Sequence, residues 1–463
     1  MSAPPNARNL KTGPDAIPRA SQFASLFAAF FGAFLGLALL KFGNPPIFEK
    51  WVTAPADGYE LLLGYPWPIT WAYGLLALLC LVGLGAARWQ LPRPRWILVL
   101  PAAWLAWQFL AATQSLDPTL SAGTVRHFAA CTACFYVGVF VLGHANRNVF
   151  WICLSVALVV VLGLGFEQHF GGLEETRRYF FLYLYPKMNQ FPPEYLKKLS
   201  SNRIFGTLFY PNALAGALLL VMPPVVAAVL QIRRMTTAAK SFLAGLIVLA
   251  GFCCLYWSGS KGGWLLMVFL GVVGLLHLPA PKRWKVVVVA MVVMAGTAGF
   301  ALKYAGFFRR GATSVVARFD YWRAAVQTTA AHPVTGTGPG TFAIPYERIK
   351  RPESEMSRLV HNDYLEQATD SGIIGFLTYT AFVAGILWVT RPAGLGDPVR
   401  FATWLGVLGW GLQGLVEFGL YVPALAWPAF AFMGLLLHNR GLRQGELKSF
   451  DKPEGAALPS GRR

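Results

Sequence analysis

The chain has 463 residues, of which 55% are hydrophobic, 14% aromatic and only 13% charged, and its mean hydropathy is +0.48. A soluble protein of this length is excluded, because repeated apolar runs of roughly 17 to 25 residues are typical of membrane-spanning helices. The formal charge of +19 does not indicate nucleic-acid binding, because lysine and arginine gather in every second connection between apolar runs. The six cysteines lie within apolar runs and imply no disulfide framework.

Twelve apolar runs predict membrane-spanning helices. In chain order they cover residues 22–43, 69–87, 96–114, 124–143, 149–166, 204–230, 241–258, 262–278, 286–303, 372–390, 401–418 and 421–438. The basic connections place the N-terminus inside, and polar tails are expected over 1–21 and 439–463. Residues 22–303 would hold nine spans with short loops, 304–371 a large outer loop, and 372–438 the last three spans. The fold class is therefore an all-α polytopic membrane protein with about 12 transmembrane helices.

An outer loop is expected over 167–203, and the sixth predicted span follows it. Because a proline inside an apolar helix frees backbone groups, Pro211 followed by Asn212 indicates that this span lines a wet cavity. Between the seventh and eighth spans, residues 257–264 predict a tight outer turn that leaves Lys261 at the surface. This lysine fits either a membrane-surface anchor or, beside two glycines, a contact with a phosphate.

The outer loop at 304–371 is rich in arginine, which topology permits in a long outer loop but does not require. Residues 318–325 predict an amphipathic helix on the membrane, and residues 333–342 predict a glycine-rich turn. This turn is not a dinucleotide fingerprint, because it has neither that spacing nor a preceding strand. Glu417, at the outer end of the eleventh span, is expected to pair with an outer arginine.

A polar cluster precedes the tenth predicted span, within residues 358–372. Asp363 and Glu366 have the spacing of a capping box, in which Asp363 begins a helix and Glu366 reaches back to a free backbone N–H. Ser371 and Gly372 would end this short helix and turn the chain into the span. Capping leaves His361 unexplained. It fits either a structural residue or a group that takes a proton from a hydroxyl.

Five short motifs occur in order between residues 200 and 380. They are Arg203-x-x-Gly206-Thr-x-x-x-Pro211-Asn212-x-x-Ala215, Ser260-Lys261-Gly262-Gly263-Trp264, Arg318-x-x-x-Trp322-x-x-Ala325, Pro333-x-x-Gly336-x-Gly338-x-Gly340-x-Phe342 and His361-Asn362-x-Tyr364-Leu365 with Gly372-x-x-Gly375. Together with a large outer loop before a late span, they resemble the O-antigen ligase and polymerase superfamily. These proteins are bacterial membrane glycosyltransferases that use polyprenyl-diphosphate-linked glycans.

The resemblance implies roles for individual residues. Arg203 and Arg318 would hold the donor diphosphate, and His361 would be the base or the group that orients the acceptor. Lys261 stands where the family often has arginine, and a lysine holds phosphate as a point charge rather than bidentately. The supporting positions would be Asn212, Asn362 and Tyr364.

The resemblance also implies a reaction and its surroundings. Cations that stabilise a dianionic leaving group make a metal unnecessary, so we expect no metal and no cofactor. The expected partners are an undecaprenyl-diphosphate-linked glycan donor, a lipid A-core or glycan acceptor and membrane lipids, with no nucleic acid. The expected location is the bacterial inner membrane, with the large loop and the active site facing the periplasm.

The acceptor decides between several activities of this superfamily. A lipid A-core hydroxyl would make the protein an O-antigen ligase, which the layout of spans and outer loop favours, with inverting, metal-independent transfer. A growing glycan would make it a polymerase, and a protein serine or threonine an O-oligosaccharyltransferase. From another class, a transporter would be expected to bury ionisable residues near the middle of the membrane.

Overall fold

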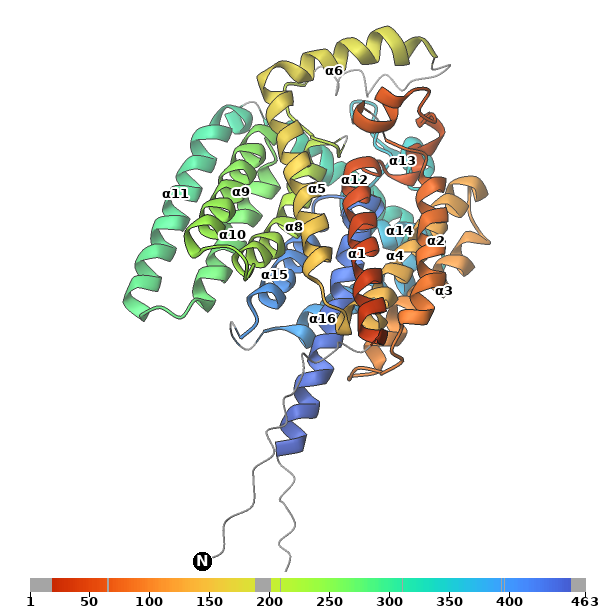
Figure 1. The fold of residues 1–463 in the computed structure, drawn as a ribbon. Helices are drawn as coiled ribbons and strands as arrows, with labels where there is room; N and C mark the ends of the chain where they lie inside the picture. Colours follow the sequence, from red (N-terminus) through yellow and green to blue (C-terminus); the bar gives the residue numbers. More distant parts are fainter. Residues whose placement is uncertain are drawn as a thin grey trace, which may run out of the picture.

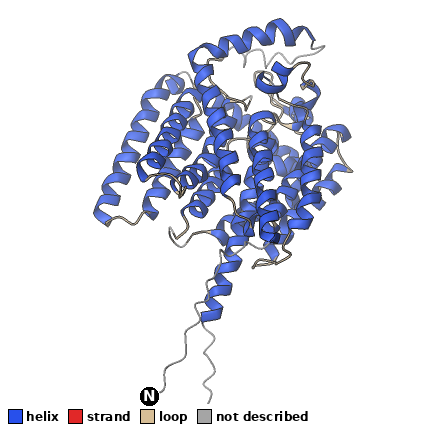
Figure 2. Cartoon of the chain, viewed as in Figure 1, coloured by secondary structure: helices blue, strands red, loops and turns tan. Residues whose placement is uncertain are grey.

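The computed structural model describes residues 19–64, 66–187, 201–208, 210–309, 311–392, 394 and 396–450, and these residues form helices and loops without a β-strand (Figure 2). The main helices are α1 (Arg19–Lys41), α2 (Ile69–Ala86), α3 (Trp96–Ala112), α4 (Pro118–Phe140), α5 (Asn148–Glu167), α6 (Leu173–Tyr179), α8 (Pro211–Leu230), α9 (Thr237–Ser258), α10 (Lys261–His277), α11 (Lys282–Arg309), α12 (Thr313–Ala331), α13 (Ala343–Ile349), α14 (Asp363–Thr390), α15 (Pro398–Gln413) and α16 (Pro423–Phe450). The predicted tails lie outside the described residues over 1–18 and 451–463.

The membrane character predicted from the sequence is confirmed. Each of the twelve predicted spans overlaps a helix. By length and composition, eight helices of the described chain can cross a membrane: Gln22–Lys41, Ile69–Ala86, Pro118–His144, Asn148–Leu182, Pro211–Leu230, Thr237–Ser258, Lys282–Arg309 and Asp363–Thr390. Shorter apolar helices lie at Trp96–Ala112, Lys261–His277 and Pro423–His438. The chain is therefore a multi-pass membrane protein, while the total of twelve spans stays a prediction.

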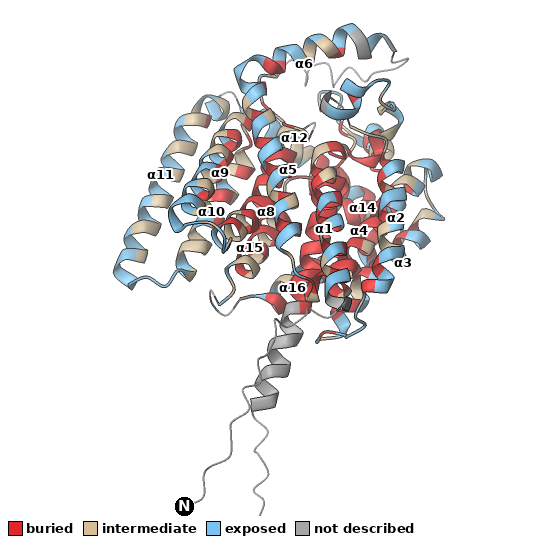
Figure 3. Cartoon of the chain, in the orientation of Figure 1, coloured by how far each residue is buried: buried red, intermediate tan, exposed pale blue. Residues whose placement is uncertain are grey.

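The centre of the bundle is formed by α16, which packs mainly against α4, while α8 packs against α9 and α15 (Figure 1). Buried residues concentrate in α4, α8, α15 and α16, and α11 lies exposed at the edge (Figure 3). A Cβ on Gly138 of α4 would lie 2.3 Å from the carbonyl oxygen of Ala431 on α16. Glycine therefore allows the two backbones to approach closely, as small residues do between helices in membranes.

The start of the sixth span was predicted wrongly. The helix begins at Pro211, not at residue 204, and Pro211 is its first residue. A proline there lacks an N–H that would have no helical partner anyway, so it frees no backbone group. The argument for a wet cavity from this proline therefore fails. The preceding segment is held by Gln168, whose Oε1 accepts hydrogen bonds from the backbone N–H of Phe205 and Gly206 at 3.0 and 2.8 Å.

The expected outer loop at 167–203 begins as a helix. Beyond α5 the chain stays helical through Gln168–Gly172, α6 and Phe180–Leu184. Gly171, at φ 130°, interrupts the regular geometry between α5 and α6. After this bend α6 lies across the end of the bundle (Figure 1).

The predicted glycine-rich turn at 333–342 packs on the end of a short helix. Helix α14 is broken at Ser371 and Gly372, as the sequence predicted, so residues 363–370 form a separate helical segment. The backbone N–H of Thr337 and Gly338 donate to the carbonyl oxygens of Thr369 and Asp370 at 2.8 and 2.9 Å. The turn thus binds carbonyl groups that have no partner within the short helix.

Gly336→Ala should destabilise the protein more than Gly311→Ala. Both glycines have positive φ, 64° and 86°, so both variants meet a backbone cost of about 1–2 kcal/mol. A Cβ at Gly336 would also lie 2.3 Å from the carbonyl oxygen of Thr369, whereas nothing lies within 4 Å of one at Gly311. Thermal unfolding of the two variants in the same detergent would measure the difference. Equal losses would contradict the packing described here.

Candidate active site

Four segments that are distant in sequence meet at one end of the bundle. Arg203 precedes α8, Arg318 lies on α12, His361 precedes α14, and Glu417 lies between α15 and α16. Helices α8 and α14 begin at this end, whereas α9 and α15 finish there. The topology therefore brings together polar residues that flank apolar helices, and Asn212, at the second position of α8, joins them.

The carboxylate of Glu417 is the centre of this group. Its Oε1 accepts hydrogen bonds from the Arg318 guanidinium and, at 2.6 Å, from the side-chain amide of Asn212. Its Oε2 lies 3.3 Å from Nδ1 of His361. The expected pairing of Glu417 with an outer arginine is confirmed. Burial alone would raise the pKa of Glu417, but the charges of Arg318, His361 and Arg203 outweigh it and hold the pKa below its ordinary value.

Arg203 is connected to Glu417 through Asn212. Its guanidinium donates to Oδ1 of Asn212 at 2.7 Å and to the carbonyl oxygen of Ser258 at 2.6 Å. A Cβ on Gly259 would lie 3.2 Å from the guanidinium, so the αL glycine that ends α9 leaves space for this side chain. Burial lowers the pKa of Arg203, yet a guanidinium stays protonated in proteins.

Arg318 is fixed at both sides of its guanidinium. Besides Glu417, it donates to the carbonyl oxygens of Val416 and Ser314 at 3.0 and 3.2 Å. Burial would lower the pKa of Arg318, but the carboxylate of Glu417 raises it above its ordinary value. Glu417 contacts Arg318 directly and Arg203 only through Asn212, so two guanidinium groups face one carboxylate and this part of the site retains a positive charge in excess.

His361 has an unusual backbone and an aromatic surrounding. Its φ is 57°, a left-handed conformation that is uncommon for residues other than glycine. Its ring centroid lies 4.8 Å from that of Phe418, 5.8 Å from that of Tyr321 and 6.2 Å from that of Tyr210. Backbone strain of this kind often occurs at functional sites. Here the conformation aims the imidazole at Glu417, while the next residue begins to cap α14.

The predicted capping box is wrong by one residue. Asn362, not Asp363, caps α14, because its Oδ1 accepts from the backbone N–H of Tyr364 and Leu365, both at 3.0 Å. Glu366 does reach back to a free backbone N–H, that of Val360, at 2.6 Å. Tyr364 donates its hydroxyl to the carbonyl oxygen of Gly411 at 2.8 Å. Asn362 and Tyr364 therefore position the start of α14 without contacting Glu417.

The acidic residues of the polar cluster face inward. Asp363, Glu366 and Asp370 are at most 1% exposed. Asp363 accepts from the backbone N–H of Leu420 at 3.0 Å, and Asp370 accepts from the N–H of Gly340 and the hydroxyl of Tyr421, both at 2.7 Å. These carboxyl groups hold the short helix against the neighbouring loops. His361, in contrast, faces the cationic group through its contact with Glu417.

Lys261 lies close to Arg203 but in a different environment. It is the first residue of α10, directly after the turn in which Ser258 accepts from Arg203. Its ammonium group lies 3.8 Å from the ring centroid of Phe307 and 5.2 Å from that of Tyr304. Lys303 on the same helix as these rings donates to the carbonyl oxygen of Tyr256. Sequence reasoning missed this second lysine.

Sequence reasoning also missed Glu417 as a site residue. The signal that could have revealed it was a single acidic residue between two apolar runs, at the membrane face where the other candidates are expected. An ionisable residue in such a position is usually functional, and its partner is usually an opposite charge.

The described residues hold no group of three or more His, Cys, Asp or Glu side chains that could bind a metal ion.

The arrangement can perform two chemical tasks. Two fixed guanidinium groups can stabilise negative charge that develops on an oxygen-rich leaving group. The imidazole can accept a proton from a hydroxyl, and the carboxylate beside it can stabilise the resulting imidazolium. Both tasks accelerate the transfer of a group from a diphosphate to a hydroxyl.

Comparison with known proteins identifies the central part of the chain. Residues 246–380 match the family model described as O-antigen ligase. The matched segment contains Lys261, Arg318 and His361, whereas Arg203 and Glu417 lie outside it. A search of curated proteins found no match.

Proposed function

Because residues 246–380 match the family model described as O-antigen ligase, we propose that the protein transfers a glycan from undecaprenyl diphosphate to a hydroxyl of lipid A-core. The observation that supports this most directly is the convergence of Arg203, Arg318 and His361 around Glu417. It supplies cations for a diphosphate and a base for a hydroxyl at one place.

The proposed reaction is a direct displacement at the anomeric carbon. The acceptor oxygen attacks this carbon from the side opposite the diphosphate, a new glycosidic C–O bond forms, and the bond to the diphosphate oxygen breaks. The leaving oxygen takes the electron pair, and Arg203 and Arg318 stabilise its charge. His361 takes the hydroxyl proton, while Glu417 holds the imidazole in place. The configuration of the anomeric carbon is inverted.

The surroundings follow from the same proposal. Basic residues such as Arg147 and Arg233 lie in connections at the other end of the bundle, and the positive-inside rule puts such connections in the cytoplasm. The active site then faces the periplasm of a bacterial inner membrane. Arg318 lies on α12, which is not among the helices apolar enough to cross a membrane, and His361 precedes α14, which argues against the transporter interpretation.

Transfer in vitro tests the proposal. Purified protein would be mixed with undecaprenyl-diphosphate glycan and lipid A-core in the presence of EDTA, and the products would be separated by mass. We expect glycan joined to lipid A-core. Glycan lengthened on its lipid carrier would instead identify a polymerase, and transfer to an added protein would identify an O-oligosaccharyltransferase. Absence of every product with a wild-type protein that remains folded would contradict glycosyl transfer.

A further inference from the structure

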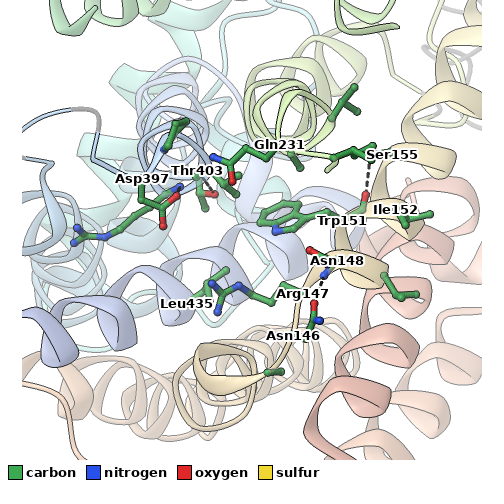
Figure 4. Close-up of a pocket in the computed structure, with 18 of the residues that line it drawn as sticks. Asn146, Arg147, Asn148, Trp151, Ile152, Ser155, Gln231, Asp397, Thr403 and Leu435 are labelled. Carbon is green, nitrogen blue, oxygen red and sulfur yellow. Dashed lines mark hydrogen bonds between the residues drawn. The ribbon is translucent and has the colours of Figure 1, made fainter. Parts of the chain in front are cut away.

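A second candidate site is a cavity of about 1460 Å³ at the opposite end of the bundle (Figure 4). It lies between α1, the start of α5, the end of α8, the start of α15 and α16. Near its start, helix α8 places Asn212 beside Glu417. Near its end, it places Val229 in the wall of this cavity. Its 20 residues extend over about 30 Å, the thickness of the hydrocarbon core of a membrane. The cavity and the candidate active site therefore belong to opposite faces of the membrane.

The cavity is strongly cationic. Four arginines line it together: Arg147 from the connection before α5, Arg233 and Arg234 from the connection between α8 and α9, and Arg400 from the first turn of α15. Among the described lining residues Asp397 is the one carboxylate, and its Oδ1 already accepts from the backbone N–H of Arg400 at 3.0 Å as the cap of α15. The positive-inside rule explains why each connection is basic, but it does not require them to converge on one cavity.

The position of Arg147 is fixed by the protein. Its guanidinium donates to the carbonyl oxygens of Leu142 and Gly143 at 3.1 and 3.0 Å. In Figure 4, Arg147 and Trp151 lie between Asp397 and Thr403 on one side and Ile152 and Ser155 on the other. A side chain held in this way loses little freedom when it binds an anion.

The remaining walls are largely apolar. They include Leu26, Trp151, Ile152, Val229 and Leu435. A small hydrophilic anion would leave this surface unused, and a neutral lipid would bring no negative charge to the guanidinium groups. An amphiphile with a phosphate head and an acyl chain matches both kinds of wall. Tryptophan is also typical of the boundary between headgroups and chains.

We propose that this cavity binds an anionic phospholipid, with its phosphate among Arg147, Arg233, Arg234 and Arg400 and an acyl chain along Trp151 and Ile152. Guanidinium groups bind phosphate oxygens through paired N–H donors. The site does not depend on the proposed glycosyl transfer, because it lies at the other end of α8.

Native mass spectrometry of the full chain in detergent tests this site. Phosphatidylglycerol and phosphatidylcholine would be titrated separately onto wild type, Arg233→Gln/Arg234→Gln and Arg400→Gln. The matched control is Arg93→Gln/Arg95→Gln, which removes two exposed arginines from the connection between α2 and α3. This connection lies at the same end of the bundle, since the backbone N–H of Arg88 donates to the carbonyl oxygen of Phe140 at 2.8 Å.

We expect wild type and the control to bind phosphatidylglycerol more tightly than phosphatidylcholine. Each cation near an anionic lipid contributes roughly fivefold, so the double variant should bind about thirtyfold and Arg400→Gln about fivefold more weakly. Size-exclusion chromatography would confirm that the variants remain folded. If the double variant does not fold, Arg400→Gln still tests the site.

Three results would overturn the proposal. Equal binding of the two lipids by wild type would show that the cavity does not select an anionic headgroup. An equal loss in the control would show a general effect of surface charge. Displacement of phosphatidylglycerol by an equal concentration of inorganic phosphate would show that the cavity binds free phosphate instead of a lipid.

Discussion

Arg318→Gln should slow glycan transfer about 10²- to 10³-fold, because it removes a fixed cation from the place where the departing diphosphate gains charge. Arg318→Lys should retain part of the rate, since a lysine supplies the charge without the fork of donors that contacts Val416 and Glu417. Transfer to lipid A-core by purified variants would be measured at saturating acceptor. The KM for the donor would be compared with kcat, because a group that acts only in the transition state changes kcat more.

Two controls separate catalysis from charge balance. Arg323→Gln removes an exposed arginine from the same helix and should leave transfer nearly unchanged. Arg318→Gln leaves the carboxylate of Glu417 without its guanidinium, and a buried unpaired charge could by itself disturb the site. The double variant Arg318→Gln/Glu417→Gln removes both charges. If it recovered transfer, the role of Arg318 would be to neutralise Glu417, and our mechanism would be wrong.

His361→Gln should slow transfer about 10²- to 10⁴-fold, the usual contribution of a positioned base. Glutamine keeps a polar group of similar length next to Glu417 but cannot take the proton of the acceptor. The measurement is the initial rate of transfer with a detergent extract of folded variant, checked by thermal unfolding. An unchanged rate would show that the acceptor needs no base here and that His361 serves only the backbone before α14.

Glu417→Gln supplies a separate test by its effect on the pH profile. The pKa of Glu417 is held below its ordinary value, so this carboxylate remains ionised between pH 5 and 8 and does not itself titrate there. A carboxylate beside an imidazole favours the protonated form. Its removal should move the acid side of the transfer profile to lower pH and reduce the maximal rate. A profile of unchanged shape would contradict the contact between Glu417 and His361.

The sequence was most informative where hydrophobicity decides the structure. Apolar runs predicted a helix at each of the twelve places, because a chain segment in lipid must satisfy its own backbone hydrogen bonds and a helix does so. Helix ends were less predictable, since they depend on individual contacts. The side chain of Gln168 keeps the chain before Pro211 out of the helix, and Asn362 displaces Asp363 as the cap of α14.

The candidate site was predicted in part. Arg203, Arg318 and His361 were chosen through a family resemblance, and the structure brings them to one place without testing their roles. Glu417 and the bridging position of Asn212 could not be deduced from spacing, because their contact joins residues 205 positions apart. Such a contact is set by the way α8 packs beside α15. Lys261 has aromatic neighbours in the structure that no local motif revealed.

The order of synthesis gives the contact at Glu417 a further meaning. Translation makes Arg203 first, then Arg318 and His361, and Glu417 last of the four. Until the segment between α15 and α16 leaves the ribosome and enters the membrane, the carboxylate that contacts Asn212, Arg318 and His361 is not yet present. The candidate site is therefore completed late in membrane insertion, and an incomplete nascent chain holds its cations without the residue that arranges them.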